Sequence, residues 1–115
     1  MSRMDRIDEL IRREVSEILI RRVNDHRIGF ISVVRVKTSP DLSLATIYYS
    51  QIGNDEEKRR TSNALRSATG FIRGEVGKKL TLKVVPRIKF QFDDSIERGD
   101  DLLKKIKALN VPPAE

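Results

Sequence analysis

The sequence predicts an α+β domain in which a three-stranded sheet carries its helices on one face. Long segments repeat apolar residues every three or four positions, whereas three short segments alternate apolar with polar residues. In chain order the segments read α-β-β-α-α-β, with a further helix near the C-terminus. The length of 115 residues suits one domain around a single core. We expect residues 1–110 to form this domain and residues 111–115 to be a short flexible tail.

The first half of the chain is predicted to be a helix followed by a hairpin. The helix runs from about Arg3 to Arg22, and Asn24-Asp25 ends it. Its apolar face consists of Met4, Ile7, Ile11, Val15 and Ile18. Two β-rich segments follow, Phe30–Thr38 and Leu44–Ser50, joined by the turn residues Ser39-Pro40-Asp41. The residues predicted to face the core are Val34 and Val36 in the first strand and Ala45, Ile47 and Tyr49 in the second.

The second helix begins at Asn54, an N-cap residue with Glu57 in the capping-box position. Its packing face is predicted to contain Thr61, Ala64, Leu65 and Ala68, with Arg59, Asn63 and Arg66 on the opposite face. The stretch Ser67-Ala68-Thr69-Gly70-Phe71 then predicts a break, because serine, threonine and glycine are weak helix formers. A third helix resumes with Ile72, Val76 and Leu80.

The last predicted strand opens after Pro86, with Ile88, Phe90 and Phe92 toward the core. A final helix is expected to start near Asp94 or Ser95. Its apolar residues are Leu102, Leu103, Ile106 and Leu109.

The positive charge of the chain is concentrated in one segment, from Lys58 to Lys89. This segment holds ten basic residues and one acid, Glu75, for a net charge of +9. The remaining residues comprise 13 basic and 16 acidic ones, a net charge of −3. Such an uneven distribution indicates a binder of polyanions. The alternative is a solvated surface on which charges cluster by chance.

Composition excludes several other classes of protein. The absence of cysteine excludes disulfides and thiolate metal sites. The N-terminal MSRMDRIDEL lacks the apolar region of a secretory signal, and no apolar run approaches a membrane span. We therefore expect a soluble, cytoplasmic protein without membrane contact.

The predicted order of elements is that of the type II KH (K-homology) domain, an RNA-binding fold. KH domains grip a nucleic-acid backbone with a GxxG loop between their two middle helices. The chain contains the match Gly74-Glu75-Val76-Gly77, but inside the third predicted helix. An acid at this point would repel phosphate, so we assign these glycines to close helix packing.

At the predicted helix junction the sequence instead reads Ala68-Thr69-Gly70. An Ala-x-Gly kink in place of GxxG resembles the ribosome-binding factor A family, bacterial assembly factors of the small ribosomal subunit. RIDELIRREVSEIL (6–19), SPDLSLATIYYS (39–50) and GFIRGEVGKKLTLKVVPRIKFQFDDS (70–95) resemble other parts of that family. Two departures are Asp25-His26-Arg27, where the family often has Asp-Pro-Arg, and the end of this sequence at Glu115, where some members carry a long flexible C-terminal tail.

The Ala-x-Gly junction has a physical interpretation as a binding elbow. Gly70 could adopt backbone angles closed to other residues, and Ala68 would keep the elbow thin. Ser67 or Thr69 could cap a helix N-terminus that favours a phosphate. A helix stop at Gly70 with no binding role is the alternative.

No catalytic or cofactor site is predicted. His26 is the sole histidine and lies beside Asp25, an arrangement that would suit the general base of a ribonuclease, but a lone loop histidine is usually a surface residue. Asp93-Asp94 could suggest a metal pair, although capping of the helix that follows is the favoured role. We expect no metal and no cofactor.

The resemblance implies a monomer that binds the small ribosomal subunit and its rRNA and supports late rRNA maturation, notably in the cold. The predicted RNA-binding residues are Arg59, Arg60, Arg66, Ser67, Ala68, Thr69, Gly70, Arg73, Lys78, Lys79 and Lys83. Because aromatic residues are few, recognition should depend mainly on shape and backbone. The alternatives are a protein-interaction module that docks on a ribosomal protein or assembly GTPase, and a general nucleic-acid binder.

Overall fold

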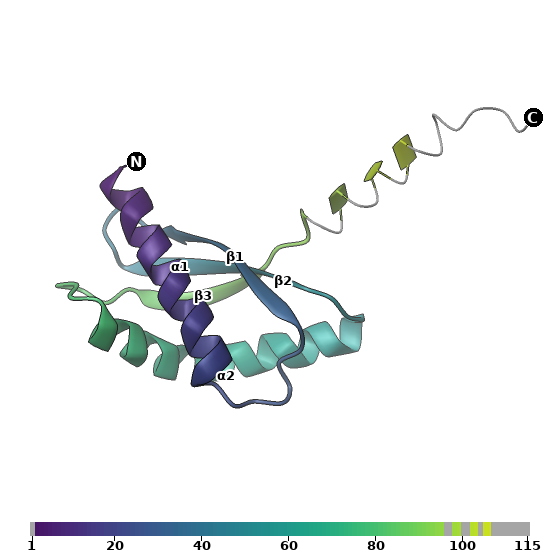
Figure 1. Cartoon of the computed structure of the whole chain (residues 1–115), viewed down its shortest axis with the longest axis horizontal. Helices are drawn as coiled ribbons and strands as arrows, with labels where there is room; N and C mark the ends of the chain where they lie inside the picture. The colour runs from purple at the N-terminus through teal and green to yellow at the C-terminus, as the bar shows by residue number, and fades with distance from the viewer. Residues whose placement is uncertain (1, 96–97, 100–101, 104, 107–115) are drawn as a thin grey trace, which may run out of the picture.

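The computed structural model describes residues 2–95, 98–99, 102–103 and 105–106. Its elements are α1 (Arg3–Arg21), β1 (Ile31–Thr38), β2 (Leu44–Gln51), α2 (Asp55–Lys79) and β3 (Arg87–Phe92). Figure 1 shows these elements in one α+β body. The predicted class and order are confirmed, except that the two predicted middle helices are one.

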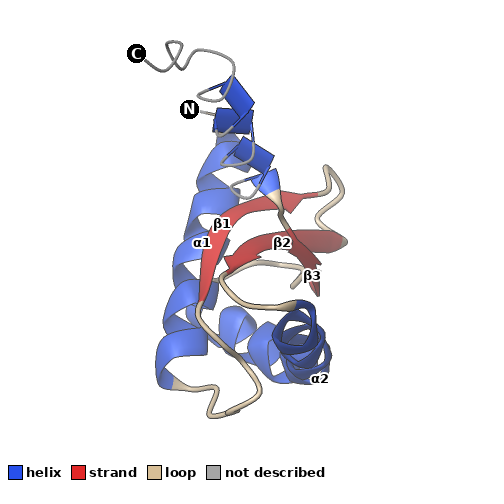
Figure 2. Cartoon of the chain, turned by 90° about the vertical axis from the view of Figure 1, so that its right-hand side faces the viewer, coloured by secondary structure: helices blue, strands red, loops and turns tan. Residues whose placement is uncertain are grey.

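The sheet has the strand order β1-β2-β3, in which β1 and β2 are antiparallel and β2 and β3 are parallel. Both helices pack on one face of it, and Figure 2 shows the other face of the strands uncovered by α1 and α2. One buried cluster joins the helices to all three strands: Ile11, Val15, Ile18, Val36, Ala45, Ile47, Ile72, Val76 and Ile88. The predicted apolar faces of the first helix and second strand are thus confirmed.

The alternation predicted for β1 fails at Val34, whose side chain is 39% exposed. A register shift lies between Val33 and Arg35 in the pairing with β2. A β-bulge of this kind places an extra residue in one strand and so reverses the faces beyond it. Val33 therefore packs against the core in place of Val34, and Val36 is buried as predicted.

The helix α2 continues without interruption through residues 67–71, so the predicted break there is wrong. Gly70 does not have a positive φ, and the only glycine of the described chain that does is Gly53. The Ser67 hydroxyl donates to the carbonyl oxygen of Asn63 at 3.1 Å, and that of Thr69 to Arg66 at 2.9 Å. Such back-bonds bend helices without ending them. The two halves of α2 indeed run in different directions in Figure 1.

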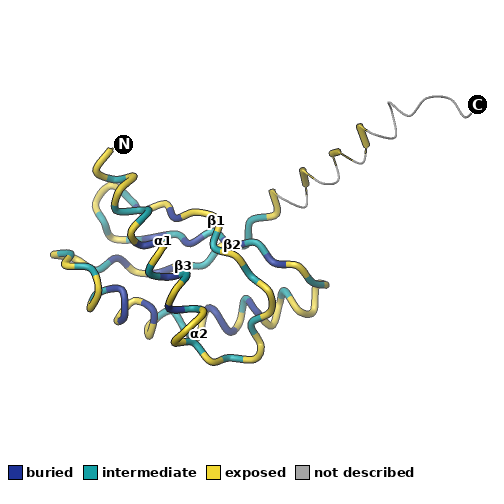
Figure 3. Tube along the Cα trace, in the orientation of Figure 1, coloured by how far each residue is buried: buried dark blue, intermediate teal, exposed yellow. Residues whose placement is uncertain are grey.

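The strand β3 keeps its predicted orientation but is less buried than expected. Ile88 is buried, whereas Phe90 and Phe92 are partly buried, as Figure 3 shows along this strand. Both rings contact Tyr49 edge-on, with centroid separations of 6.2 and 5.8 Å. The position of β3 at the edge of the sheet explains the exposure, because no further strand covers its outer side.

The predicted C-terminal helix is described only in part. Ser95, Arg98, Gly99, Leu102, Leu103, Lys105 and Ile106 have helical backbone. Leu102 and Leu103 are 58% and 57% exposed, so their side chains do not join the core. Leu109 and the predicted tail at 111–115 lie outside the described residues.

Candidate nucleic-acid interface

The predicted RNA-binding residues lie along α2 and the loop that follows it. All are exposed except Ala68 and Thr69, which are partly buried. Arg59, Arg66 and Arg73 recur every seven residues, so they form one line along the helix over roughly 21 Å. The predicted outer basic face of this helix is therefore confirmed as a solvent-facing surface.

A groove separates the middle of α2 from the strand β3. It has a volume of about 220 Å³ and is lined by Ser62, Arg66, Thr69, Ile88, Lys89 and Phe90. Arg66 gives the groove a positive charge. Lys89 lines it from β3, but its side chain alternates with those of Ile88 and Phe90 and therefore belongs to the opposite face of the sheet. Among the described residues neither side chain forms an ion pair.

Arg73 extends this basic line to the loop that precedes β3. Its guanidinium donates from Nε and Nη2 to the carbonyl oxygen of Val85, at 3.3 and 2.9 Å. The same loop residue lies against Gly77, where an added Cβ would be 3.0 Å from Val85 Cγ2. The C-terminal half of α2 and the loop are therefore closely packed, and Arg73 is held while its guanidinium remains exposed.

The other predicted cations are not equally available. Arg59 lies 2.9 Å and Arg60 3.6 Å from the same Glu56 carboxylate oxygen, in the acidic first turn of α2. Lys78 lies 3.4 Å from Glu75. Lys79 and Lys83 form no ion pair within the described part of the chain. The structure thus brings Arg66 and Thr69 together beside β3, places Arg73 against the loop that precedes it, and spreads the remaining cations toward the two ends of α2.

Residues 67–70 form part of the continuous helix α2 and not the predicted elbow between two helices. Because α2 is continuous, no helix N-terminus is free there to bind a phosphate, and that part of the prediction is wrong. The hydroxyls of Ser67 and Thr69 serve the preceding helical turn instead of a cap. Gly70 is nevertheless exposed, and apart from its chain neighbours and the nearby helix backbone no atom lies within 4 Å of the Cβ position that it lacks. A backbone can therefore approach the helix closely at this glycine.

The GxxG match at residues 74–77 lies within α2 and is no loop, as predicted. Its acid, Glu75, is 7% exposed and lies 3.7 Å from Arg22 as well as near Lys78. The packing role predicted for the two glycines holds for Gly77 but not for Gly74, which has open space around it.

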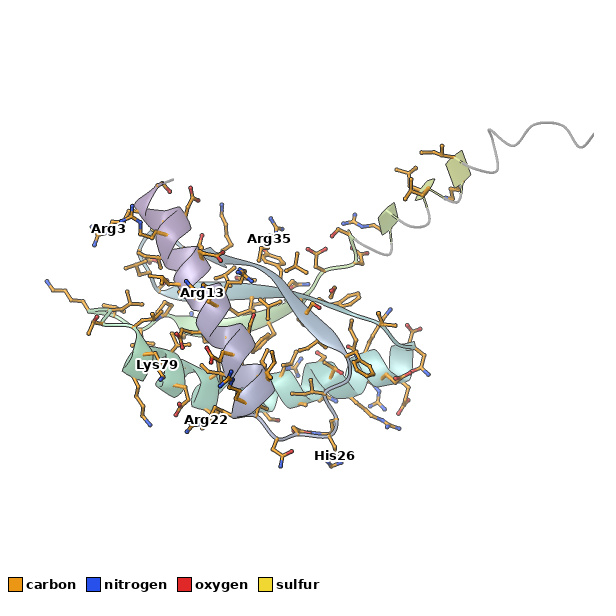
Figure 4. The ribbon with its side chains drawn as sticks, in the orientation of Figure 1. Arg3, Arg13, Arg22, His26, Arg35 and Lys79 are labelled. Carbon is orange, nitrogen blue, oxygen red and sulfur yellow. The ribbon has the colours of Figure 1, made fainter. Side chains whose placement is uncertain are left out.

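The loop between α1 and β1 provides no catalytic arrangement. Figure 4 shows His26 pointing outward from this loop. The neighbouring Asp25 carboxylate accepts hydrogen bonds from the Arg27 side chain at 2.6–3.2 Å, which lower the pKa of Asp25 to about 2. Asp25 is therefore engaged by Arg27 and does not orient the imidazole.

No group of three or more potential metal ligands occurs in the part of the chain that the structure describes. Asp93 Oδ1 accepts a hydrogen bond from the backbone N–H of Ser95 at 2.8 Å, which agrees with the predicted capping role of this acid pair. None of the described helices combines the length and apolar character that crossing a membrane requires.

Four residues of the groove were not among the predicted RNA-binding residues: Ser62 and Lys89, and also Ile88 and Phe90, which were predicted to face the core. Lys89 belongs to the basic segment, and its alternation with Ile88 and Phe90 already predicts an exposed side chain. The sequence does not show which residues lie near Lys89 in space, because the position of β3 beside α2 depends on contacts between distant segments. Ser62 carries no signal of its own beyond its place one turn before Arg66.

The chain matches proteins of known family over most of its length. Residues 3–106 match the family model described as ribosome-binding factor A. A ribosome-binding factor A of Dictyoglomus thermophilum is 51% identical over 110 residues, which cover 95% of this chain and 92% of the relative. A ribosome-binding factor A of Geotalea daltonii is 42% identical over 110 residues, which cover 96% of this chain and 89% of that relative.

Solved structures agree with these matches. A solution structure of a Thermotoga maritima protein, provisionally described as a ribosome-binding factor A, is 33% identical, with a TM-score of 0.66 and coverage of 80% and 88%. A homology model of the Thermus thermophilus ribosome-binding factor A, fitted into the cryo-electron microscopy map of a 30S complex, shares the fold with 20% identity and a TM-score of 0.65. The match covers 79% of this chain and 96% of that one. This chain belongs to the ribosome-binding factor A family.

Proposed function

We propose that the protein is a non-catalytic assembly factor that binds the small ribosomal subunit through its rRNA and supports late rRNA maturation. The observation that carries this proposal is the basic line on α2, whose middle borders the groove beside β3. A cationic groove on an otherwise neutral-to-acidic body favours a polyanion. Family membership indicates the ribosome as the place where that polyanion is found, and a homology model of the Thermus relative was fitted into the map of a 30S complex.

The residues have distinct roles in this proposal. Arg66 contacts a phosphate from the groove, and Arg73 contacts one beside the loop that precedes β3. Arg59 and Arg60 contact phosphates after exchanging Glu56 for RNA. Lys78, Lys79 and Lys83 extend the positive field toward the end of α2. Ser67, Ala68, Thr69 and Gly70 form the part of the helix surface to which the RNA backbone comes closest. Phosphate contacts of this kind position an RNA without reading its sequence.

The proposed biology follows from the family. The protein would act in the cytoplasm as a monomer and matter most in the cold, where misfolded RNA helices rearrange slowly. Ribosomal proteins and an assembly GTPase are further proposed partners.

The test is co-sedimentation with immature and mature small subunits. Changing Arg59, Arg66 and Arg73 together to Ala should weaken binding to the subunit, because the substitutions remove three exposed positive charges from the basic line along α2. Each lost phosphate contact should lower the slope of log affinity against log salt by about 0.7 to 0.9. Thermal melts of the variant check that the loss of the Arg73–Val85 bond leaves the protein folded.

A charge-matched control changes Arg3, Arg6 and Arg13 of α1 to Ala. These arginines are exposed, and Figure 4 shows Arg3 and Arg13 on α1. The control should keep most of the affinity. Wild-type affinity and salt slope in the α2 variant, or an equal loss in both variants, would contradict the proposed surface.

A second candidate function, docking on a protein partner, is favoured by one observation. Ile20, Phe30 and Ile52 are 82%, 87% and 84% exposed, and Phe30 lines two adjoining pockets of about 480 and 580 Å³. Exposed apolar surface of this kind often marks protein contacts. Binding through it would be nearly independent of salt, whereas binding through phosphates would not.

Competition with unrelated RNA and DNA separates a general nucleic-acid binder from a factor specific for the subunit.

A further inference from the structure

The sheet face turned away from the helices is polar and carries a regular array of side chains. Two rows cross all three strands: Arg35, Tyr48 and Gln91 form one, and Lys37, Thr46 and Lys89 the other. All six side chains are exposed or partly buried. With strands about 4.8 Å apart, each row spans roughly 10 Å.

The centre of the first row is a stacked pair. The Arg35 guanidinium carbon lies 4.3 Å from the centroid of the Tyr48 ring. Figure 4 shows Arg35 on the side of the sheet that faces away from α2. A guanidinium over a ring at this distance makes a cation–π contact, and both guanidinium groups and aromatic rings are groups on which an unpaired base can stack.

The charge around this pair is positive. Lys37, Arg87 and Lys89 are exposed, and with Arg35 they form no ion pair with any described residue. The nearest acid along β3 is Asp93, whose pKa is lowered mainly by the hydrogen bond from Ser95 and in lesser part by Arg35. A second group of acids, Asp5, Asp8 and Glu9, belongs to α1 and borders the face only at its β1 edge.

The array is continuous with the groove described above. Lys89 lies in the edge strand β3, which lines the groove and also contributes to the second cross-strand row. A single strand of RNA lying in the groove can therefore cross the edge of the sheet at Lys89 and reach Tyr48, which lies in the neighbouring strand β2. Neither α1 nor α2 covers this path (Figure 2).

We propose that the open sheet face is a second RNA-binding site, specific for single-stranded RNA. One base stacks on the Arg35–Tyr48 pair, and Lys37 and Lys89 contact the phosphates on either side of it. The site rests on the proposed function only in taking RNA as the ligand, since none of its residues belongs to the line on α2. It adds base stacking to a surface for which shape and backbone recognition were expected.

The test measures binding of a fluorescein-labelled oligouridylate of about ten nucleotides, a length within the usual site sizes for single strands. Tyr48→Thr removes the ring and keeps a residue that favours strands, whereas Tyr48→Phe keeps the ring as the matched control. We expect a roughly tenfold loss of affinity for Tyr48→Thr and near wild-type affinity for Tyr48→Phe. Lys37→Gln with Lys89→Gln should weaken binding and lower its salt slope by about 1.4, for two phosphates. Binding of a duplex RNA of the same length should be unchanged in Tyr48→Thr.

Several outcomes would overturn the site. They are undetectable oligouridylate binding by the wild type, equal affinity of folded Tyr48→Thr and wild type, or displacement of the oligonucleotide by polyglutamate as readily as by RNA. The proposed function is judged separately, because the α2 variants are assayed on whole subunits. Loss of subunit binding in the α2 variant together with unaltered oligouridylate binding in Tyr48→Thr would leave the function intact and remove this site alone.

Discussion

At the scale of single residues, Gly70 shows how neighbours overrule local preference. Glycine costs a helix interior about 1 kcal/mol relative to alanine, which made a break at this point reasonable. The helix continues because Leu65 before it and Ile72 and Val76 after it are all fully buried, the last two in the cluster that includes the strands. Packing of an apolar face stabilises a helix more than the propensities of a few residues can oppose.

Two glycines of α2 should therefore respond differently to alanine. Gly70→Ala should raise stability by up to about 1 kcal/mol, because the backbone is helical and the added methyl meets open space. Gly77→Ala should gain less or lose stability, since its methyl would press on Val85 at 3.0 Å. Thermal melts of both variants check the order. A lower melting temperature for Gly70→Ala than for Gly77→Ala would mean that Gly70 is held in a non-helical conformation.

Gly70→Ala also tests close approach of RNA. If the RNA backbone comes close at residue 70, the more stable variant should bind the small subunit less well. Unchanged co-sedimentation would place the contact elsewhere on α2.

The hairpin turn contains a carboxylate with a strongly lowered pKa. Hydrogen bonds from the hydroxyls of Ser43 and Ser39 lower the pKa of Asp41 from 3.8 to about 2. A group whose folded pKa is lowered contributes stability above its unfolded pKa and loses it as the pH falls through the folded value. The turn should thus keep its carboxylate contacts down to about pH 3 and lose them toward pH 2.

Nuclear magnetic resonance titration of the Asp41 carboxyl carbon should show a midpoint near 2. Ser43→Ala should raise that midpoint, since the Ser43 side chain makes the largest contribution to the shift. A midpoint near 3.8 in the wild type would mean that these hydrogen bonds do not persist in solution.

At the scale of elements, α2 combines an acidic beginning with a basic end. Asp55, Glu56 and Glu57 lie in the first turn, and Lys78 and Lys79 lie in the last. Both sets are favourable for the helix dipole. The same arrangement decides which cations are available to RNA, because Glu56 engages Arg59 and Arg60 whereas Arg66, in the middle of the helix, has no acid beside it among the described residues.

The N-cap of α2 gives a prediction for this element. The Asn54 side chain accepts a hydrogen bond from the N–H of Glu57 at 2.8 Å, and the Glu57 carboxylate accepts one from Asn54 at 3.2 Å. Asn54→Ala should cost about 1 kcal/mol of unfolding free energy, and Asn54→Asp should cost little because aspartate caps equally well. Urea unfolding of the three proteins measures the difference. Equal stability of Asn54→Ala and wild type would show that this cap is dispensable.

At the scale of the whole molecule, the fold depends on one apolar layer between the sheet and two helices. Ile47 lies in the central strand and is fully buried within the cluster that joins α1, α2 and all three strands. Ile47→Ala should cost about 2–5 kcal/mol, the usual range for such a truncation. Phe90→Ala should fall below the 3–5 kcal/mol of a fully buried ring, because Phe90 is only partly buried.

Chemical denaturation with a two-state fit measures both changes. If Phe90→Ala lowers the free energy of unfolding more than Ile47→Ala does, the edge strand and not the central one contributes most to the core. Loss of RNA binding by Phe90→Ala at unchanged stability would instead make Phe90 a contact residue of the groove.

The sequence by itself determined what depends on local periodicity. The apolar face of α1, the inward residues of β2, the capping box at Asn54 and the outer basic face of α2 all follow from spacing and residue type, and all are confirmed. Only the tertiary structure decided the continuity of α2, the bulge between Val33 and Arg35, and the parallel pairing of β3 with β2. These features depend on contacts between residues far apart in the chain. The spacing of apolar residues, every three or four positions in a helix or every two in a strand, carries no information about such contacts. Both proposed RNA-binding surfaces depend on that pairing, because it places β3 beside Arg66 on one side and aligns Lys89 with Thr46 and Lys37 on the other.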